Sequence, residues 1–412
     1  AWQAALAHDA TLRAARAGAD AGREGVAVAR AAGRPQVTLS ASREHHDALT
    51  RPGELRQSYY GGTQSLAIRQ ALFQPVQDAT LAQALAQADE GEAAQAQARQ
   101  QLAVRLAEAY FELLLSQDQL DLVQAQTAAH ARQLDAARKA WAAGSGTRTD
   151  IDEAQARLDL DAAETLRVEQ QRERARLQLR HLVGEPFGRV AALDPVRFDA
   201  MPLPDEGMDA WIDEALRASP EVQAMQARRD AAAREVDKAR ARHAPTLDLV
   251  AQRTRSQSES LSRIGSRSTS DTVGLQLAVP LYAGGGIEAG ERRALAELAR
   301  GEAQLQALRE DLALRIQQAH RGVAEARVRA RALQQAVHSA QQLVRSVTRA
   351  YQAGVRTTVD VLDAEQQLAQ ARRDLAQTRY LALMSHLRLK ALAGRADEAE
   401  IERLNACLDP AR

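Results

Sequence analysis

The 412-residue sequence has few aromatic residues, one cysteine and no net charge. Lys+Arg and Asp+Glu number 54 each, a balance that gives no support for nucleic-acid binding, which needs a basic excess or a basic face. Cys407 alone cannot form an internal disulfide or a thiolate metal cluster. No run of 18 apolar residues occurs, so the sequence predicts no transmembrane helix.

Motifs of catalysis are also missing. The sequence contains no phosphate-binding loop, nucleophile elbow or metal-ligand cluster, so we expect neither an enzyme nor a cofactor. Without an ATP site the chain would not power transport itself. No signal peptide is evident, and a helical pattern begins at Ala1; the chain is either a mature form or a trimmed one.

The sequence matches itself when it is displaced by 210 positions, which indicates an internal duplication. The marker pairs are Gly144 and Gly354, Thr147 and Thr357, Asp150 and Asp360, and Gly184 and Gly394. Near Leu72 and Leu281 the offset is 209, a one-residue difference in a loop. We therefore predict a first repeat over residues 1–206 and a second over 207–412.

Each repeat predicts the same order of elements. A helix (about 1–31 and 207–242) precedes a strand (about 36–46 and 245–256), a polar segment and a second strand (about 63–73 and 271–282). A long helix (about 74–142 and 286–352) and a further helix, which ends near Gly184 or Gly394, complete the repeat. The apolar seam of the second long helix follows steps of four and three: Leu312, Ile316, Ala319, Val323, Ala326, Ala330, Leu333, Val337, Ala340, Val344, Val347 and Tyr351. Such a helix is roughly 100 Å long, and the alanines in the seam allow neighbouring helices to approach closely.

The four predicted strands have the length that suits a bilayer-spanning barrel. An open sheet of four strands would leave two unpaired edges, which hydrocarbon does not tolerate. Two copies of the chain would give a barrel of eight strands filled by side chains, whereas three copies would give twelve and leave a lumen. The alternative is a soluble β-subdomain on a coiled-coil structural scaffold, which is not a channel.

Several stretches together resemble the TolC family of bacterial outer-membrane efflux proteins. The strongest is Tyr351–Ala364 (Tyr-Gln-Ala-Gly-Val-Arg-Thr-Thr-Val-Asp-Val-Leu-Asp-Ala), and Trp141–Asp150 is its counterpart in the first repeat. Residues 109–111, 245–249 and 274–285 also match. The resemblance covers nearly the whole chain and is closer to the type I secretion branch, which exports toxins, as the adenylate cyclase toxin exporter does.

The resemblance implies a mixed, predominantly α fold and a homotrimer. In the trimer, each chain contributes four strands, at about 36–73 and 245–282, to a transmembrane barrel of twelve strands. This barrel continues as a long helical barrel across the periplasm. The resemblance also implies an equatorial part at residues 185–206 and 395–412. It places the chain in the outer membrane, in contact with lipid, as the passive, gated exit duct of a tripartite machine. A periplasmic adaptor and an inner-membrane transporter dock on the helical tips, and the cargo is either a protein toxin or drugs.

Asp360 and Asp363 are the candidate gate residues. In the family the corresponding aspartates line the closed periplasmic entrance, and in a trimer each would form a carboxylate ring that selects cations and can be blocked by a multivalent cation. No permanent metal site is expected. The simpler interpretation of Asp360 is helix capping, since Thr357 and Asp360 have the spacing of a capping box, as do Thr147 and Asp150.

The resemblance also assigns a latch. Tyr351 and Arg356 match residues that hold the entrance closed by bonding to a neighbouring helix pair, at the positions of Thr149 and Asp150. The alternative is that Tyr351 ends the apolar seam and Arg356 is solvated. The turns at Gly144 and Thr147 and at Gly354 and Thr357 would meet the adaptor, in addition to their local role as helix ends. Glu153 replaces Asp363 in the first repeat, which suggests a gate carried by the second repeat only.

Overall fold

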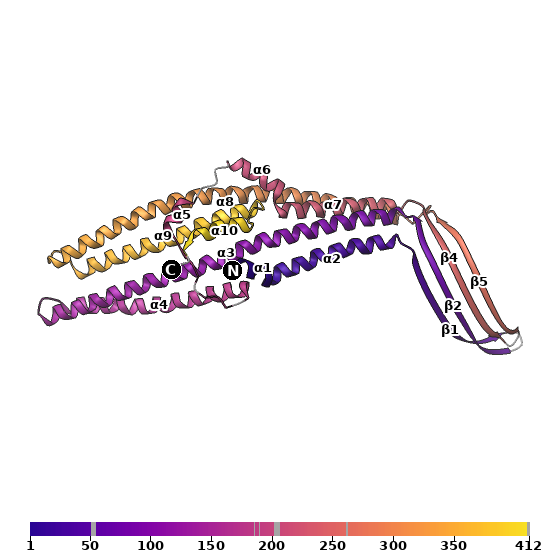
Figure 1. Cartoon of the computed structure of the whole chain (residues 1–412), viewed down its shortest axis with the longest axis horizontal. Helices are drawn as coiled ribbons and strands as arrows, with labels where there is room; N and C mark the ends of the chain where they lie inside the picture. The colour runs from indigo at the N-terminus through magenta and orange to yellow at the C-terminus, as the bar shows by residue number, and fades with distance from the viewer. Residues whose placement is uncertain (51–54, 185, 189, 202–206, 261–262, 410–412) are drawn as a thin grey trace. The chain divides into compact units, whose positions relative to one another are not determined.

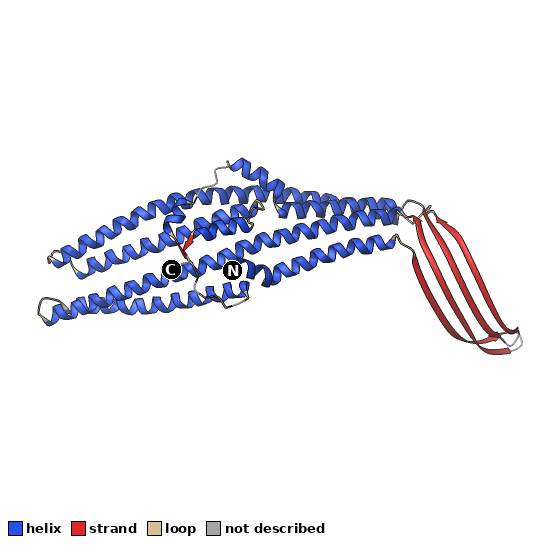
Figure 2. Cartoon of the chain, in the orientation of Figure 1, coloured by secondary structure: helices blue, strands red, loops and turns tan. Residues whose placement is uncertain are grey.

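The computed structural model describes residues 1–50, 55–184, 186–188, 190–201, 207–260 and 263–409. Within these ranges the protein is predominantly helical, with a four-stranded and a two-stranded antiparallel sheet (Figure 2). It divides into two compact units: residues 1–16, 94–223 and 308–412 form the first, and residues 17–93 and 224–307 form the second. Each unit therefore combines segments from both sequence repeats.

The second unit contains a sheet with the strand order β1-β2-β4-β5 (Figure 1). Its strands are β1 (Gln36–Thr50), β2 (Leu55–Phe73), β4 (Thr246–Ser260) and β5 (Arg263–Ala278). Each repeat supplies one hairpin, and β2 pairs with β4 to join the two hairpins. The outer strands are β1 and β5, so the sheet of one chain has two edges.

The strands are longer than the sequence predicts. Most of the polar segments that we expected between them continue the strands, because the antiparallel pairing runs in register to Thr50 and Leu55 in the first hairpin. The residues there are mostly polar, so apolar and polar side chains do not alternate along the strand, but the backbone hydrogen bonds between the strands continue. At the other end β5 stops at Ala278 instead of residue 282, close to Pro280, which has no N–H to donate to a neighbouring strand.

Small residues bring the helices of the second unit close together. The unit includes parts of α2 (Ala10–Ala32), α3 (Pro75–Ala142), α7 (Pro220–Ala241) and α8 (Gly286–Gln352). A Cβ atom on Gly91 would lie 3.2 Å from the Cα atom of Ala19, and one on Gly22 would lie 3.3 Å from the Cα atom of Ala88. These glycines let α2 and α3 approach closely, because a larger side chain at either position would meet the backbone of the neighbouring helix.

The first unit has the larger apolar core. It includes α1 (Trp2–His8), α4 (Arg148–Val183), α6 (Met208–Ala218) and α9 (Thr358–Leu392), with parts of α3 and α8. The core contains Leu102, Leu106, Leu179, Leu383 and Leu387. Along α8 the seam is buried at Leu312, Ile316, Val323 and Ala330 and half-buried from residue 333 to residue 351, so the predicted heptad face is the packed face.

Two of the predicted helices are interrupted. The helix expected over 1–31 breaks at Asp9, whose carboxylate accepts a hydrogen bond from the Leu12 N–H at 2.7 Å and so caps α2. The helix expected over 207–242 breaks at Ser219, and Pro220 begins α7. Proline is tolerated at this first position because a backbone N–H there would make no hydrogen bond within the helix. The boundaries of α3 and α8 agree with the sequence prediction to within a residue.

The two segments predicted as the equatorial part meet in the first unit. Strand β3 (Ala192–Leu193) pairs with β6 (Leu408–Asp409), beside α5 (Pro195–Ala200) and α10 (Glu398–Ala406). Residues 185, 189, 202–206 and 410–412 of these segments lie outside the described residues. None of the described helices combines the length and the apolar character that a membrane crossing requires.

Candidate functional site

The turn that joins α3 to α4 and the turn that joins α8 to α9 have the same backbone design. Gly144 and Gly354 have φ angles of 76° and 75°, in the left-handed region that glycine adopts without steric cost. The Ser145 N–H bonds to the Ala140 carbonyl at 2.9 Å, and the Val355 N–H bonds to the Ala350 carbonyl at 2.9 Å. Both turns are therefore Schellman motifs, which satisfy the last carbonyls of the long helices.

The next helix of each hairpin begins with a complete capping box. The Thr147 hydroxyl accepts from the Asp150 N–H, and the Asp150 carboxylate accepts from the Thr147 N–H at 3.0 Å. Thr357 and Asp360 repeat the arrangement, with the Thr357 N–H 2.8 Å from the carboxylate. The capping role that the sequence predicts for both aspartates is confirmed.

The cap hydrogen bonds also set the charge of these aspartates. Bonds from Thr357, first from its backbone N–H and then from its hydroxyl, hold the pKa of Asp360 below its ordinary value, and Arg356 contributes further. For Asp150 the Thr147 hydroxyl is the main cause of a lowered pKa, and the Thr358 hydroxyl of α9 adds a smaller effect. Both carboxylates are therefore ionised at neutral pH.

Within one chain the predicted latch residues bind close to their own turn. An Arg356 guanidinium nitrogen lies 3.2 Å from an Asp360 carboxylate oxygen one helical turn away. The Thr358 hydroxyl donates to the Tyr351 hydroxyl oxygen at 3.4 Å. Thr149 lies in the first turn of α4, beside Asp150. The latch to a neighbouring helix pair stays a prediction, and within one chain Arg356, whose side chain is 57% exposed, pairs with Asp360 of its own hairpin.

Asp363 differs from Asp360 because it is bound by the other hairpin. Arg157 of α4 lies 3.1 Å from an Asp363 carboxylate oxygen, and a second guanidinium nitrogen lies 2.6 Å from the Gln366 side-chain oxygen. Sequence reasoning missed Arg157 because its partner is more than 200 positions away in the chain. No group of three or more His, Cys, Asp or Glu side chains within the described ranges is arranged to hold a metal ion.

The four-stranded sheet has two chemically different faces. One face carries large apolar side chains that are 38% to 76% exposed: Val37, Leu39, Leu66, Ile68, Leu249, Val273, Leu275 and Leu277. On the alternate positions, which point to the opposite face, the Gln252 amide donates to the Ser65 hydroxyl at 2.9 Å and to the Thr254 hydroxyl at 3.2 Å. The sheet therefore exposes an apolar band on one side and polar groups on the other.

Comparison with known families identifies the type of protein. The family described as "Outer membrane efflux protein" matches residues 1–185 and 211–395, two ranges that begin 210 positions apart. The chain belongs to the outer membrane efflux protein family. The resemblance to TolC is confirmed, and the protein is an outer-membrane channel that extends into the periplasm.

Relatives of this outer membrane efflux protein cover almost all of the chain. The proteases secretion protein PrtF of Dickeya chrysanthemi is 32% identical over 98% of the chain and 90% of the relative. The alkaline protease secretion protein AprF of Pseudomonas aeruginosa is 32% identical over 98% of the chain and 86% of the relative. Among solved structures, the outer membrane protein VceC of Vibrio cholerae has a TM-score of 0.79 at 23% identity and covers 95% of both chains. The structural likeness confirms the fold.

Proposed function

We propose that three copies of this outer membrane efflux protein form one continuous export duct. The single observation that carries the proposal is the four-stranded sheet, with its exposed apolar band, its polar opposite face and its two edges at β1 and β5. A sheet of this kind satisfies its backbone in lipid only if its edges are paired. Pairing β5 of each chain with β1 of the next gives a closed barrel of twelve strands.

In this barrel the apolar band faces lipid and the polar face lines the lumen, the alternation that membrane barrels require. The long α3 and α8 helices with α4 and α9 continue the duct through the periplasm. The elements β3, α5, α10 and β6 belong to a belt around it. The duplication supports this arrangement, because two similar repeats in three chains supply six similar helical hairpins to one ring.

The cargo that we propose is a secreted protein, moved through the duct by an inner-membrane transporter and a periplasmic adaptor. The names of the two protease secretion relatives support this class over drugs. The adaptor contacts the two turns at Gly144 and Thr147 and at Gly354 and Thr357. The duct itself is passive, and its gate consists of the carboxylates of Asp360 and Asp363 with the Tyr351 and Arg356 latch to Thr149 and Asp150.

The test is the mass of the protein in detergent, measured by light scattering, together with its ion conductance in planar bilayers. We expect a trimer that inserts from detergent and conducts ions. A matched variant, Leu275→Asp, places a charge in the apolar band and should reduce insertion, whereas Ser270→Asp on the opposite face should insert normally. A monomer or a dimer in detergent contradicts the proposal. A trimer that conducts ions neither as the wild type nor as either variant also contradicts it.

A further inference from the structure

Arg157 connects the two helical hairpins of one chain. Its guanidinium lies on α4 and binds two side chains of α9, at 3.1 Å from Asp363 and 2.6 Å from Gln366. These two acceptors are three residues apart, so they lie on the same face of α9. One planar guanidinium thus bridges a carboxylate and an amide on the neighbouring helix, a geometry that lysine would not reproduce.

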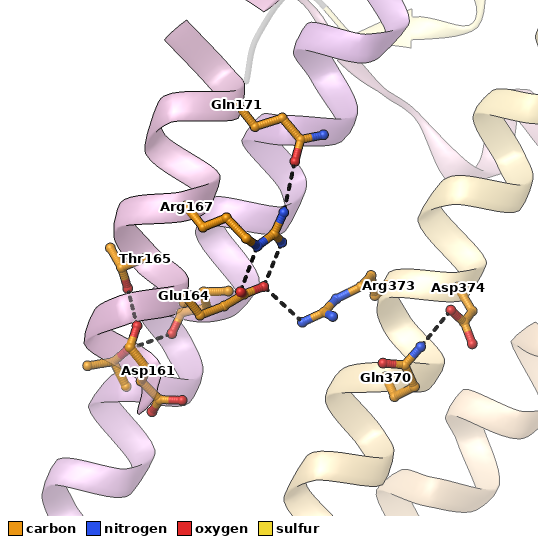
Figure 3. A network of polar contacts seen from close by, with 10 residues as sticks. Asp161, Glu164, Thr165, Arg167, Gln171, Gln370, Arg373 and Asp374 are labelled. Carbon is orange, nitrogen blue, oxygen red and sulfur yellow. Dashed lines mark hydrogen bonds and ion pairs between the residues drawn. The ribbon is translucent and has the colours of Figure 1, made fainter. Parts of the chain in front are cut away.

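A second ion pair joins α4 to α9 farther from the turns. There an Arg373 guanidinium nitrogen lies 3.9 Å from a Glu164 carboxylate oxygen. Figure 3 shows Arg373 extending from its helix toward Glu164, which Arg167 of α4 also binds at 2.7 Å. Of these two ion pairs, the one made by Arg157 involves a predicted gate residue.

The residues that form the bridge differ between the two repeats. Displacement by 210 positions places Gln367 at the equivalent of Arg157 and Glu153 at the equivalent of Asp363. Exchanging the repeats therefore replaces an arginine–carboxylate pair with a glutamine–carboxylate pair. The Arg157 side chain is 34% exposed and that of Asp363 is 55% exposed, so water reaches both and the contact can open and close.

We propose that Arg157 is the gate-positioning residue of each subunit: it ties Asp363, and with it the α9 tip, to α4 and so opposes the movement that widens the entrance. This inference rests on the duct of the proposed function. Breaking the pair has two effects, because it releases α9 and leaves the Asp363 carboxylate uncompensated. Both partners belong to one chain, so the pair acts on the gate and not on the cohesion of the trimer.

The experiment compares Arg157→Gln and Asp363→Asn in planar bilayers, in the full-length detergent-purified protein. Each variant should raise the open probability, by up to about five-fold for one exposed pair. Their reversal potentials in a salt gradient should move in opposite directions: Arg157→Gln leaves a free carboxylate and increases cation selectivity, whereas Asp363→Asn removes it. The exchange variant Arg157→Asp with Asp363→Arg should return the open probability toward that of the wild type.

Arg148→Gln is the matched control, because Arg148 lies on the same helix near the turn and pairs with Asp152 of its own helix at 3.3 Å. It should leave the open probability unchanged. A conducting wild type whose two single variants behave like Arg148→Gln overturns the role of Arg157 and leaves the duct intact. Reversal potentials that move in the same direction also overturn it. A protein that conducts in no variant contradicts the proposed function itself.

Discussion

The Nδ1 atom of His130 on α3 lies 2.6 Å from a carboxylate oxygen of Asp161 on α4, and both side chains are buried. Within the described part of the chain, the Nε2 atom of His130 has no hydrogen-bond partner, so Asp161 supplies the hydrogen bond of the ring. The pair joins α3 and α4, the two helices of the first hairpin, across their packed surface.

Removing this carboxylate should destabilise the hairpin. Asp161→Ala leaves a buried imidazole without its hydrogen-bond partner, and we expect a loss of about 1–3 kcal/mol in the free energy of unfolding. Chemical denaturation followed by circular dichroism measures the loss. Asp159→Ala on the exposed side of α4, where Asp159 accepts from Gln155 of the same helix, is the control and should change stability by less than about 0.5 kcal/mol. Equal losses in both variants contradict a special role for the buried pair.

Replacing Gly354, which lies in a left-handed turn, should change the stability of the protein in the opposite direction from replacing a glycine inside a helix. Gly354→Ala forces a Cβ into a φ of 75° and should cost about 1 kcal/mol. Gly18→Ala lies within α2, where a Cβ meets nothing within 4 Å, and should stabilise the protein by about 0.5–1 kcal/mol. Thermal unfolding of the two variants measures the difference. A stabilised Gly354→Ala variant contradicts the turn geometry.

The gate predicts a specific change in ion selectivity. Asp360→Ala combined with Asp363→Ala removes both proposed carboxylate rings, so cation selectivity and block by divalent cations should both weaken. Reversal potentials in a salt gradient and current inhibition by a divalent cation measure the two properties. The control, Asp152→Ala with Asp374→Ala, removes the same charge from residues that bind along their own helices. Unchanged selectivity and block in the first variant exclude these aspartates from the gate.

Burial of Glu365 predicts a pH dependence of stability. Burial raises the pKa of this carboxyl, against the smaller opposing effects of His130 and Arg132. The folded state therefore binds the proton more tightly than the unfolded state, and ionisation weakens folding as the pH rises above the pKa of the unfolded chain. Glu365→Gln should raise the unfolding temperature at pH 7.

The gain from Glu365→Gln should shrink as the pH falls toward about 4, because near that pH the wild-type carboxyl becomes protonated in both states. Glu169→Gln, at an exposed position of α4, is the control and should show no such dependence. Scanning calorimetry between pH 4 and pH 8 follows both variants. A gain that grows with acidity would reverse the sign and contradict the raised pKa.

Local sequence patterns predicted most of the fold. The seam from Leu312 to Tyr351 predicted the packed face of α8, and the glycine and threonine pairs predicted both turns, because capping and left-handed conformations depend on residues within a few positions. The full extent of the strands was not predictable in the same way. Their distal halves are mostly polar, and their pairing depends on a partner strand instead of on a local pattern.

The gate residues also divide into a local feature that the sequence predicts and a long-range contact that it does not. The capping function of Asp360 was visible in the sequence because Thr357 is three residues away. The contact between Arg157 and Asp363 joins residues 206 positions apart, and neither has a local feature that selects the other. Charged residues are frequent throughout these helices, so spacing within the sequence does not identify which arginine meets which carboxylate.

The length of the strands has a consequence for what the cell exposes. A strand of 15 residues, such as β1 or β4, is about 50 Å long and still rises about 38 Å in a barrel tilted by about 40°. The hydrocarbon layer is only about 30 Å thick. In the proposed barrel the polar ends of the hairpins, where His45 and Tyr60 face each other across β1 and β2 with ring centroids 4.7 Å apart, project above the lipid. The protein would thus present a hydrophilic collar to antibodies and impermeant reagents outside the cell.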